Sequence, residues 1–402
     1  METEFRLASG MAAMAPPRLR ELMGRASQAG VLSFAVGLPA VELFPGADLG
    51  RAAARLLPGE PEALQYAVPY APLKARIVEL MKMRGVDCRA EEIFLTSGTQ
   101  QSMDLLARLF LDPGGEVMLE ETVYEGVRMA LRRWAPDVVS VPTDPRRGID
   151  VAEIARRLEH GARPAFLYTI PSSHNPLGVS LDGDGLQALA ALARIHHLPI
   201  LEDDAYGFLH YDEGPPPPAL RSREERWVVY LGSFSKILAP ALRAGWIVAP
   251  AELIDRLSAL KHAADLDTPA FSHRLISAYL ERADLAAHLA VLRAEYRRRR
   301  DAMLDALDRH FPPAVRWNRP SGGMFVWVEL PAGADASALL ETALAGERIA
   351  FTPGVAFVDA GQPHAASCLR LCFTAHPPER IADGVRRLGN AVESFLGRGS
   401  GQ

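Results

Sequence analysis

The chain has 402 residues, of which 49% are hydrophobic, and a formal net charge of −5. This composition is typical of a globular protein with a large core and about two domains. The mildly acidic balance gives no electrostatic basis for binding nucleic acid or an anionic membrane, and no run of about 18 apolar residues predicts a transmembrane helix.

The three cysteines, Cys88, Cys368 and Cys372, form no paired framework, which favours a reducing compartment. Met1 to Arg20 has no continuous apolar stretch of the kind found in signal peptides, so we expect a cytoplasmic protein. We expect no metal site, because His364 is the only further candidate ligand near Cys368 and Cys372.

Between residues 90 and 250, short apolar runs alternate with segments of helical periodicity, such as Gln100–Phe110, Gly126–Trp134 and Gly185–His197. This alternation predicts an α/β fold with a mostly parallel seven-stranded sheet and helices on both faces. The expected strands are Ile93–Thr96, Val117–Glu120, Val138–Val141, Ala165–Ile170, Ile200–Glu202, Val228–Gly232 and Trp246–Val248.

After Ala251 the pattern changes to longer helices and two isolated strands, which predict a smaller α+β domain. The expected helices are Glu252–His262, Ser272–Glu281, Leu285–His310, Ala336–Ala345 and one from Pro378, and the strands are Gly323–Glu329 and Leu369–Phe373. We divide the chain into an N-terminal arm that joins the small domain (1–45), a large domain (46–285) and a small C-terminal domain (286–402).

The strongest local motif is Ser233-Phe234-Ser235-Lys236, which directly follows a predicted strand and is followed by Arg243. Open α/β sheets bind ligands beyond the carboxyl ends of their strands, and two hydroxyls with a guanidinium suit a phosphate. The alternative is a surface loop with an ordinary lysine. A second phosphate element is Gly98-Thr99-Gln100 at a predicted helix start, although Thr99 could equally be a simple helix cap.

Acidic residues end another predicted strand, at Glu202-Asp203-Asp204, with Tyr206 close behind. A buried carboxylate such as Asp203 could keep the nitrogen of a pyridine ring protonated, and the ring would then be an electron sink. Considered alone, this acidic run is equally compatible with magnesium binding or with capping of the next helix.

Three further polar residues are weak candidates individually and become informative only in combination with the other motifs. Asn175, in a loop fixed by Pro171 and Pro176, could donate to a ligand oxygen, and Tyr124 could stack on a planar ring. Arg370 lies within an apolar run and could hold a substrate carboxylate. The alternatives are a proline-rich turn, an ordinary packing tyrosine and an arginine reaching solvent from an edge strand.

Taken in order, these segments resemble the fold-type I pyridoxal 5′-phosphate (PLP) enzymes over nearly the whole chain, and most closely the branch of 2-aminoadipate and kynurenine aminotransferases. The motifs that carry the resemblance are Ser33-Phe34-Ala35-Val36-Gly37-Leu38-Pro39, Leu43-Phe44-Pro45, Leu64-Gln65-Tyr66, Ser97-Gly98-Thr99-Gln100-Gln101, Glu202-Asp203-Asp204, Ser235-Lys236 and Gly322-Gly323-Met324-Phe325. The resemblance implies a homodimer with shared active sites.

The resemblance also implies a role for each candidate. Lys236 would carry PLP as a Schiff base and transfer the proton, Asp203 would pair with the ring nitrogen, and Tyr206 and Asn175 would bond the ring hydroxyl. Arg370 would hold the α-carboxylate of the substrate, with Gly37 and Asn175 beside it. The remaining cofactor contacts would be Tyr124 on the ring and Gly98, Thr99, Gln100, Ser233, Ser235 and Arg243 around the phosphate, with Tyr66 reaching the phosphate of the partner subunit.

Three positions depart from the pattern of that branch. Val36 and Pro69 stand where glycine is usual, and His174 stands where glutamine is common. We predict ping-pong transamination between an L-amino acid and a 2-oxo acid. Because Val36 would narrow the space near the substrate side chain and His174 would lie near the cofactor, elimination, replacement, cyclisation, decarboxylation or oxidation at the same cofactor is the alternative.

A third hypothesis is a transcription regulator that uses such a domain as an effector sensor. Too few residues precede Gly37 for a DNA-binding module, and the sequence has no basic block, so we expect no nucleic-acid partner.

Overall fold

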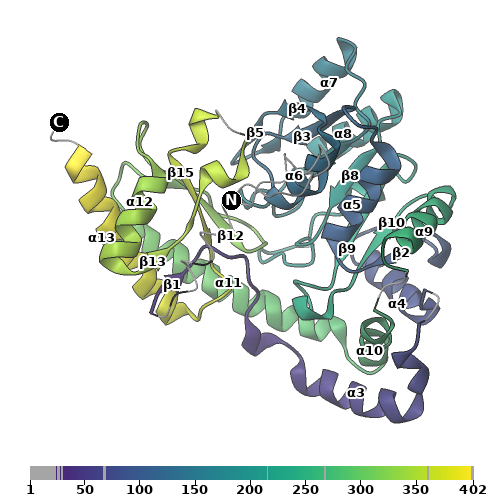
Figure 1. Ribbon diagram of the computed structural model, residues 1–402. Coiled ribbons are helices and arrows are strands. Elements are labelled where there is room, and N and C mark those ends of the chain that lie inside the picture. Colours follow the sequence, from purple (N-terminus) through teal and green to yellow (C-terminus); the bar gives the residue numbers. More distant parts are fainter. Residues whose placement is uncertain are drawn as a thin grey trace, which may run out of the picture.

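The computed structural model describes residues 24, 28, 30–66, 69–214, 216–266, 269–359 and 362–399. It confirms the predicted α/β class: a seven-stranded sheet has the strand order β2-β10-β9-β8-β7-β3-β4 (Figure 1). Each predicted strand is present, with small shifts in its ends. The strands are β2 (Ile93–Thr96), β3 (Glu116–Glu120), β4 (Asp137–Val141), β7 (Leu167–Thr169), β8 (Ile200–Asp203), β9 (Val228–Ser233) and β10 (Gly245–Val248).

Strand β10 runs antiparallel to both of its neighbours, β2 and β9, whereas the other neighbouring strands are parallel. The connection from Ser233 to Gly245 contains only a 3₁₀ turn at Pro240–Leu242. It has no crossover helix that could carry the chain to the opposite edge of the sheet, so the chain returns antiparallel.

Helices cover both faces of the sheet because neighbouring strand residues point to opposite sides. In β3, Leu119 packs with helices α5 (Thr99–Phe110), α6 (Glu125–Leu131) and α9 (Ala251–Asp265). The adjacent Met118 packs with α7 (Val151–Glu159) and α8 (Gly183–His196) on the other side. Helix α4 (Ala71–Lys82) covers the end of the sheet near β2 and β10.

Helix α11 (Leu285–His310) has the predicted bounds because Asp284 caps its start: the carboxylate accepts a hydrogen bond from the Ala287 amide at 3.0 Å. This helix packs along α13 (Pro378–Gly399) and lies below a second sheet in Figure 1. That antiparallel sheet has the order β11 (Arg316–Trp317), β12 (Phe325–Glu329), β15 (Cys368–Cys372) and β14 (Thr352–Pro353).

Short elements complete the structure on either side. Strand β1 (Leu32–Ser33), near the N-terminus, pairs in parallel with β13 (Ile349–Ala350), so the arm packs against the C-terminal part of the chain. Helix α12 (Ala336–Thr342) changes to a π-helical turn at 343–347, where the sequence predicted continuous α-helix. Helix α3 (Gly46–Gly59) packs on α10 (Ala270–Leu280), and β5 (Thr143–Asp144) forms a hairpin with β6 (Gly148–Ile149).

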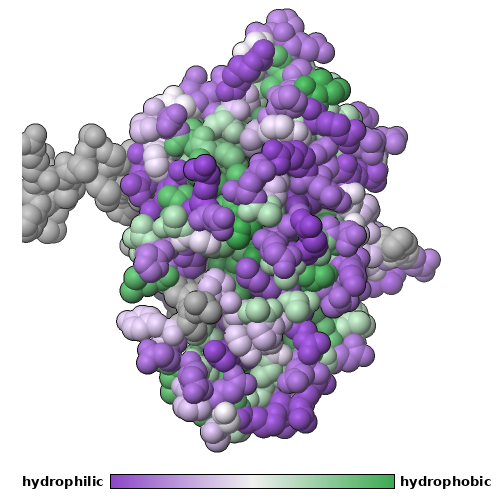
Figure 2. Space-filling model, turned by 90° about the vertical axis from the view of Figure 1, so that its right-hand side faces the viewer, coloured by the Kyte–Doolittle hydropathy of each residue, from purple (hydrophilic) through white to green (hydrophobic). Residues whose placement is uncertain are grey.

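Hydrophilic residues predominate on the face shown in Figure 2, and apolar residues form separate patches among them. Within the described part of the chain, no helix is both long enough and apolar enough to cross a membrane.

Candidate active site

The predicted site residues converge because they follow the carboxyl ends of neighbouring strands. Asn175 comes after β7, Asp203 ends β8 and Lys236 follows β9. Arg243 precedes β10, and because this strand is antiparallel, its beginning lies at the same edge of the sheet. A cavity of about 340 Å³ opens there. Its wall includes Gly37, Gly98, Thr99, Gln100, Tyr124, Asn175, Asp203, Tyr206, Ser233, Ser235, Lys236, Arg243 and Arg370.

Asp203 supplies a buried, half-satisfied carboxylate to this cavity. The residue is 4% exposed, and its Oδ2 accepts a hydrogen bond from the Tyr168 hydroxyl at 2.7 Å. Its Oδ1 has no hydrogen-bond partner in the described part of the chain. Burial raises the pKa of Asp203 to about 6. A buried acceptor without a partner is unfavourable unless a ligand supplies the missing donor, so the site fits a cationic ring nitrogen.

The anion-binding end of the cavity is built around the start of α5. Gly98 has a φ of 117°, and a Cβ at this position would lie 3.0 Å from Nη2 of Arg243, so this position requires glycine. Thr99 is the first helical residue rather than the cap that the alternative interpretation proposed. The helix N-terminus, the buried Ser233 hydroxyl and the Arg243 guanidinium together suit a phosphate dianion.

The Lys236 amine reaches the cavity from the loop between β9 and β10. Its Nζ donates a hydrogen bond to the Gly37 carbonyl at 2.8 Å. Burial lowers the pKa of Lys236 to about 8, and the positive charges of Arg370 and Arg243 act in the same direction. The amine therefore loses its proton far more readily near neutral pH than an exposed lysine does, as a nucleophile or a general base requires.

Arg370 also lines the cavity and is held in place by its neighbours. It lies in β15 between β12 and β14, so the alternative of an arginine on an edge strand is wrong. Its guanidinium carbon lies 4.2 Å from the ring centre of Phe325 and 4.7 Å from that of Phe357. Nη1 donates to Asn175 Oδ1 at 2.7 Å, while Nε has no partner among the described residues. A rigid guanidinium with free donor capacity suits a carboxylate.

Asn175 and Tyr206 are joined directly, with Asn175 Nδ2 donating to the Tyr206 hydroxyl at 3.3 Å. Tyr124 stands at the start of α6, and a Cβ on Gly126 would lie 2.1 Å from its ring. Gly126 therefore leaves space for the tyrosine ring to fold over the helix start. Sequence reasoning missed this glycine, although a glycine two residues after a candidate stacking residue was a usable signal.

His174 contacts a second buried carboxylate behind the cavity. Its Nε2 lies 2.7 Å from Glu120 Oε2, and both side chains are 1% exposed. The other oxygen of Glu120 accepts hydrogen bonds from Thr169 Oγ1 at 2.6 Å and from the Ile170 amide at 2.8 Å. Glu120 thus connects the ends of β3 and β7 to the residue that precedes Asn175. Sequence reasoning singled out His174 but not Glu120.

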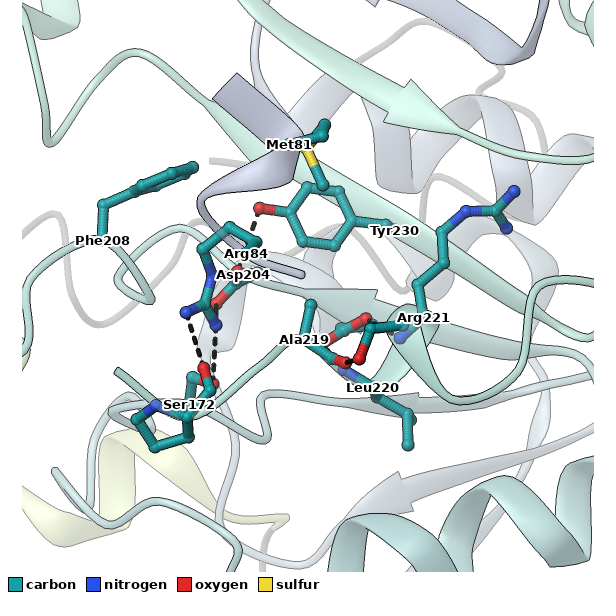
Figure 3. A network of polar contacts seen from close by, with 12 residues as sticks. Met81, Arg84, Ser172, Asp204, Phe208, Ala219, Leu220, Arg221 and Tyr230 are labelled. Carbon is teal, nitrogen blue, oxygen red and sulfur yellow. Dashed lines mark hydrogen bonds and ion pairs between the residues drawn. The ribbon is translucent and has the colours of Figure 1, made fainter. Parts of the chain in front are cut away.

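The two acidic neighbours of Asp203 have structural partners of their own. Asp204 forms a buried ion pair with Arg84, whose Nε lies 2.6 Å from Oδ2, and it accepts a hydrogen bond from Tyr230 (Figure 3). Glu202 accepts hydrogen bonds from the backbone amides of Leu220 at 2.6 Å and Arg221 at 2.9 Å. Among the described residues no group suitable for a metal ion is present.

Tyr66 lies outside the cavity. It follows the 3₁₀ turn Pro61–Leu64 and is 81% exposed. Other residues of the cavity wall that sequence reasoning did not assign are Ala35, Glu125, Ile170, Ala205, Pro240 and Phe357.

A lysine amine, an unpaired buried carboxylate and an anion site in one cavity of this fold define a fold-type I PLP enzyme. Comparison with known proteins gives the family: the chain belongs to the class I and II aminotransferases, whose family model matches residues 51–388. It is accordingly a PLP-dependent transferase that moves amino groups between amino acids and 2-oxo acids.

Two curated relatives match almost end to end. A 2-aminoadipate transaminase from Thermus thermophilus is 41% identical over 94% of each chain. Aromatic-amino-acid aminotransferase 1 from Thermococcus litoralis is 36% identical over 95% of this chain and 93% of its own. These names favour transamination over elimination, decarboxylation or oxidation.

A solved structure agrees with this assignment. The α-aminoadipate aminotransferase from Thermus thermophilus, complexed with N-(5′-phosphopyridoxyl)-L-leucine, superposes with a TM-score of 0.90 at 39% identity and covers 98% of both chains.

Proposed function

We propose that Lys236 is the catalytic lysine of a ping-pong aminotransferase. The observation that carries this assignment is the position of its amine, of depressed pKa, in the same cavity as the unpaired Asp203 oxygen. We assign to Lys236 the removal of the α-proton of the amino donor and the return of a proton in the second half of the reaction. Bound PLP supplies the electron sink for this proton transfer.

We further propose that the cavity wall divides into three functions. Asp203 balances the charge of the ring nitrogen, and Asn175 and Tyr206 hold the ring hydroxyl. Arg370, with Gly37 and Asn175, orients the α-carboxylate of the substrate, which leaves little freedom in where the α-proton meets Lys236. Tyr124 stacks on the ring, and the phosphate is held by Gly98, Thr99, Gln100, Ser233, Ser235 and Arg243.

A homodimer with shared sites is our proposal for the assembly. Leu38, Val41, Leu64 and Tyr66 are large apolar or aromatic residues that are at least half exposed, with values of 51%, 73%, 73% and 81%. Exposed residues of this kind are typical of protein interfaces. We assign Tyr66 to the phosphate site of the partner subunit. We also propose a division into the arm 1–45, the cofactor-binding domain 46–285 and the small domain 286–402.

A cytoplasmic location is consistent with the state of the cysteines. Cys88, Cys368 and Cys372 are all buried and free. Free, buried thiols are typical of proteins in reducing compartments, where disulfides are rare.

Replacing the lysine tests the central assignment. In Lys236→Ala we expect the yellow colour of the bound cofactor to disappear and turnover to fall by at least about a thousandfold, because both the nucleophile and the base are lost. The control is Lys82→Ala, since Lys82 is exposed and pairs with the exposed Glu79 on the surface. Turnover in Lys236→Ala equal to that of the control would refute the role.

A further inference from the structure

Part of the cavity lining has no assigned role toward the cofactor or the α-carboxylate. The lining residues without such a role include the apolar and aromatic residues Val36, Ile170 and Phe357 and one carboxylate, Glu125, and we refer to them as the side-chain wall. Because Arg370 directs the α-carboxylate toward Asn175, the side chain of an amino-acid substrate has to occupy the remaining space. The names of the relatives point to different donors, so the choice depends on this wall.

Glu125 presents one engaged and one free oxygen. Its side chain is 14% exposed, and Oε1 accepts a hydrogen bond from Arg132 Nη2 at 2.8 Å. No residue in the described ranges hydrogen-bonds to Oε2. Burial raises the pKa of Glu125, while Arg132 and Arg128 oppose that shift. The carboxylate is thus anchored at one oxygen and open at the other.

The nearby cations are already engaged. Arg128, which is 7% exposed, forms an ion pair with Asp359 and donates to the Glu121 carbonyl at 2.9 Å. The cavity-lining cations in the described part of the chain are Lys236, Arg243 and Arg370. All three have been assigned above, which leaves no described cation on the side-chain wall for a second substrate carboxylate.

We propose that Glu125 determines donor specificity: it selects amino acids whose side chain ends in a hydrogen-bond donor and discriminates against side chains that end in a carboxylate. This inference rests on the proposed roles of Lys236 and Arg370. A donor group would satisfy Oε2, whereas an ω-carboxylate would place two negative charges side by side in a partly desolvated pocket. Sites that pair buried polar groups discriminate strongly between near-isosteric substrates.

Glutamine and glutamate are the matched probes, because they differ only in the terminal amide and carboxylate. The holoenzyme is mixed with each donor in a single turnover, without an acceptor, and the rate is followed by the absorbance of the cofactor. Each value of kcat/KM is divided by that for leucine in the same variant. The wild type should favour glutamine over glutamate by at least about tenfold.

Glu125→Gln should lower that preference by at least about tenfold, because the amide keeps the hydrogen bond from Arg132 but removes the charge. The control is Glu121→Gln, the same change at a neighbouring residue that does not line the cavity; its preference should match the wild type. A preference unchanged by Glu125→Gln would overturn the proposal, as would a wild type that prefers glutamate.

A binding measurement separates this inference from the proposed reaction. The dissociation constants of glutarate and its monoamide, which carry no amino group, are measured by calorimetry on the holoenzymes. The wild type should bind the monoamide more tightly than glutarate. Glu125→Gln should bind glutarate more tightly than the wild type does. If these inhibitors discriminate as expected while no donor discharges the cofactor, the transamination assignment fails and the role of Glu125 stands. If donors react but Glu125→Gln changes neither the glutamine-to-glutamate ratio of kcat/KM nor the ratio of the two dissociation constants, the role of Glu125 alone fails.

Discussion

At the scale of single residues, the burial of Asp203 makes cofactor binding depend on pH. The pKa of Asp203, raised to about 6 by burial, means that the carboxylate of the cofactor-free protein takes up a proton as the pH falls through this value. The ionised form is the one that attracts a ring cation. The same shift stabilises the cofactor-free fold at low pH, and this contribution is lost as the pH rises through about 6.

We therefore expect PLP affinity to fall by up to about tenfold per pH unit below pH 6, beyond the effect of phosphate titration. Asp203→Asn should bind PLP more weakly at pH 7 and should lose this additional slope. Fluorescence titration of both apoproteins between pH 5 and 8 measures the difference, since the phosphate titrates equally in the two. Parallel pH curves for the two proteins would contradict the assignment.

The contact between His174 and Glu120 positions Asn175 and, through it, Arg370. Glu120→Gln should raise the KM of the amino donor by about tenfold with a smaller change in kcat, because the buried contact is lost and the loop shifts. His174→Gln, which restores the residue common in the resembling branch, should stay close to the wild type. Steady-state kinetics decide this, and a fall in kcat with an unchanged KM would indicate a loss of folded enzyme instead.

At the scale of elements, the ion pair of Arg84 and Asp204 connects the end of α4 to the end of β8 (Figure 3). Arg84 also donates to the Pro217 carbonyl at 2.7 Å and to Ser172 Oγ at 3.2 Å. It therefore ties α4 to both strand ends that carry Asn175 and Asp203.

Arg84→Ala should lower the free energy of unfolding by about 3–5 kcal/mol, since it leaves Asp204 charged and buried without its partner. Arg156→Ala removes an exposed pair with Glu153 and should lower the free energy of unfolding far less, because solvent screens exposed charges. Urea unfolding of the two apoproteins provides the comparison. If Arg84→Ala lowers the free energy of unfolding no more than Arg156→Ala does, water replaces the interaction between Arg84 and Asp204.

The sequence predicted helices and strands correctly where a local pattern of residues specifies them. The bounds of α11 were predicted from the helical periodicity alone, and the structure shows that Asp284 caps the predicted start. The direction of β10 was not predicted, because apolar alternation is the same in parallel and antiparallel strands. The short connection after Lys236, which has no room for a helix, was the signal that could have revealed it.

At the scale of the whole molecule, exposed Tyr66 distinguishes a shared site from a self-contained one. Lys236→Ala and Tyr66→Ala subunits are mixed, unfolded and refolded together, and assayed at low PLP. If Tyr66 serves the partner subunit, random C2 pairing should restore about a quarter of the wild-type sites. If Tyr66 serves its own subunit, or no dimer forms, activity should not exceed the sum of the two homogeneous proteins.

The sequence by itself predicted the class of sheet, the candidate cofactor-binding motifs and most residues of the cavity wall, but not Glu125, Ile170 or Phe357. It did so because each motif is short and follows a recognisable strand, and strand ends in an open α/β sheet meet at one edge. Gly98, Asp203 and Lys236 could thus be assigned without knowing the order of the strands.

Tertiary structure decided which side chains contact these residues. The partner of Asp203 is Tyr168, that of Asp204 is Arg84, and the rings that enclose Arg370 belong to Phe325 and Phe357. Most of these contacts join residues that are far apart in the chain, and all of them depend on strand order, helix packing and loop paths. These are properties of the whole fold, so no local periodicity encodes them.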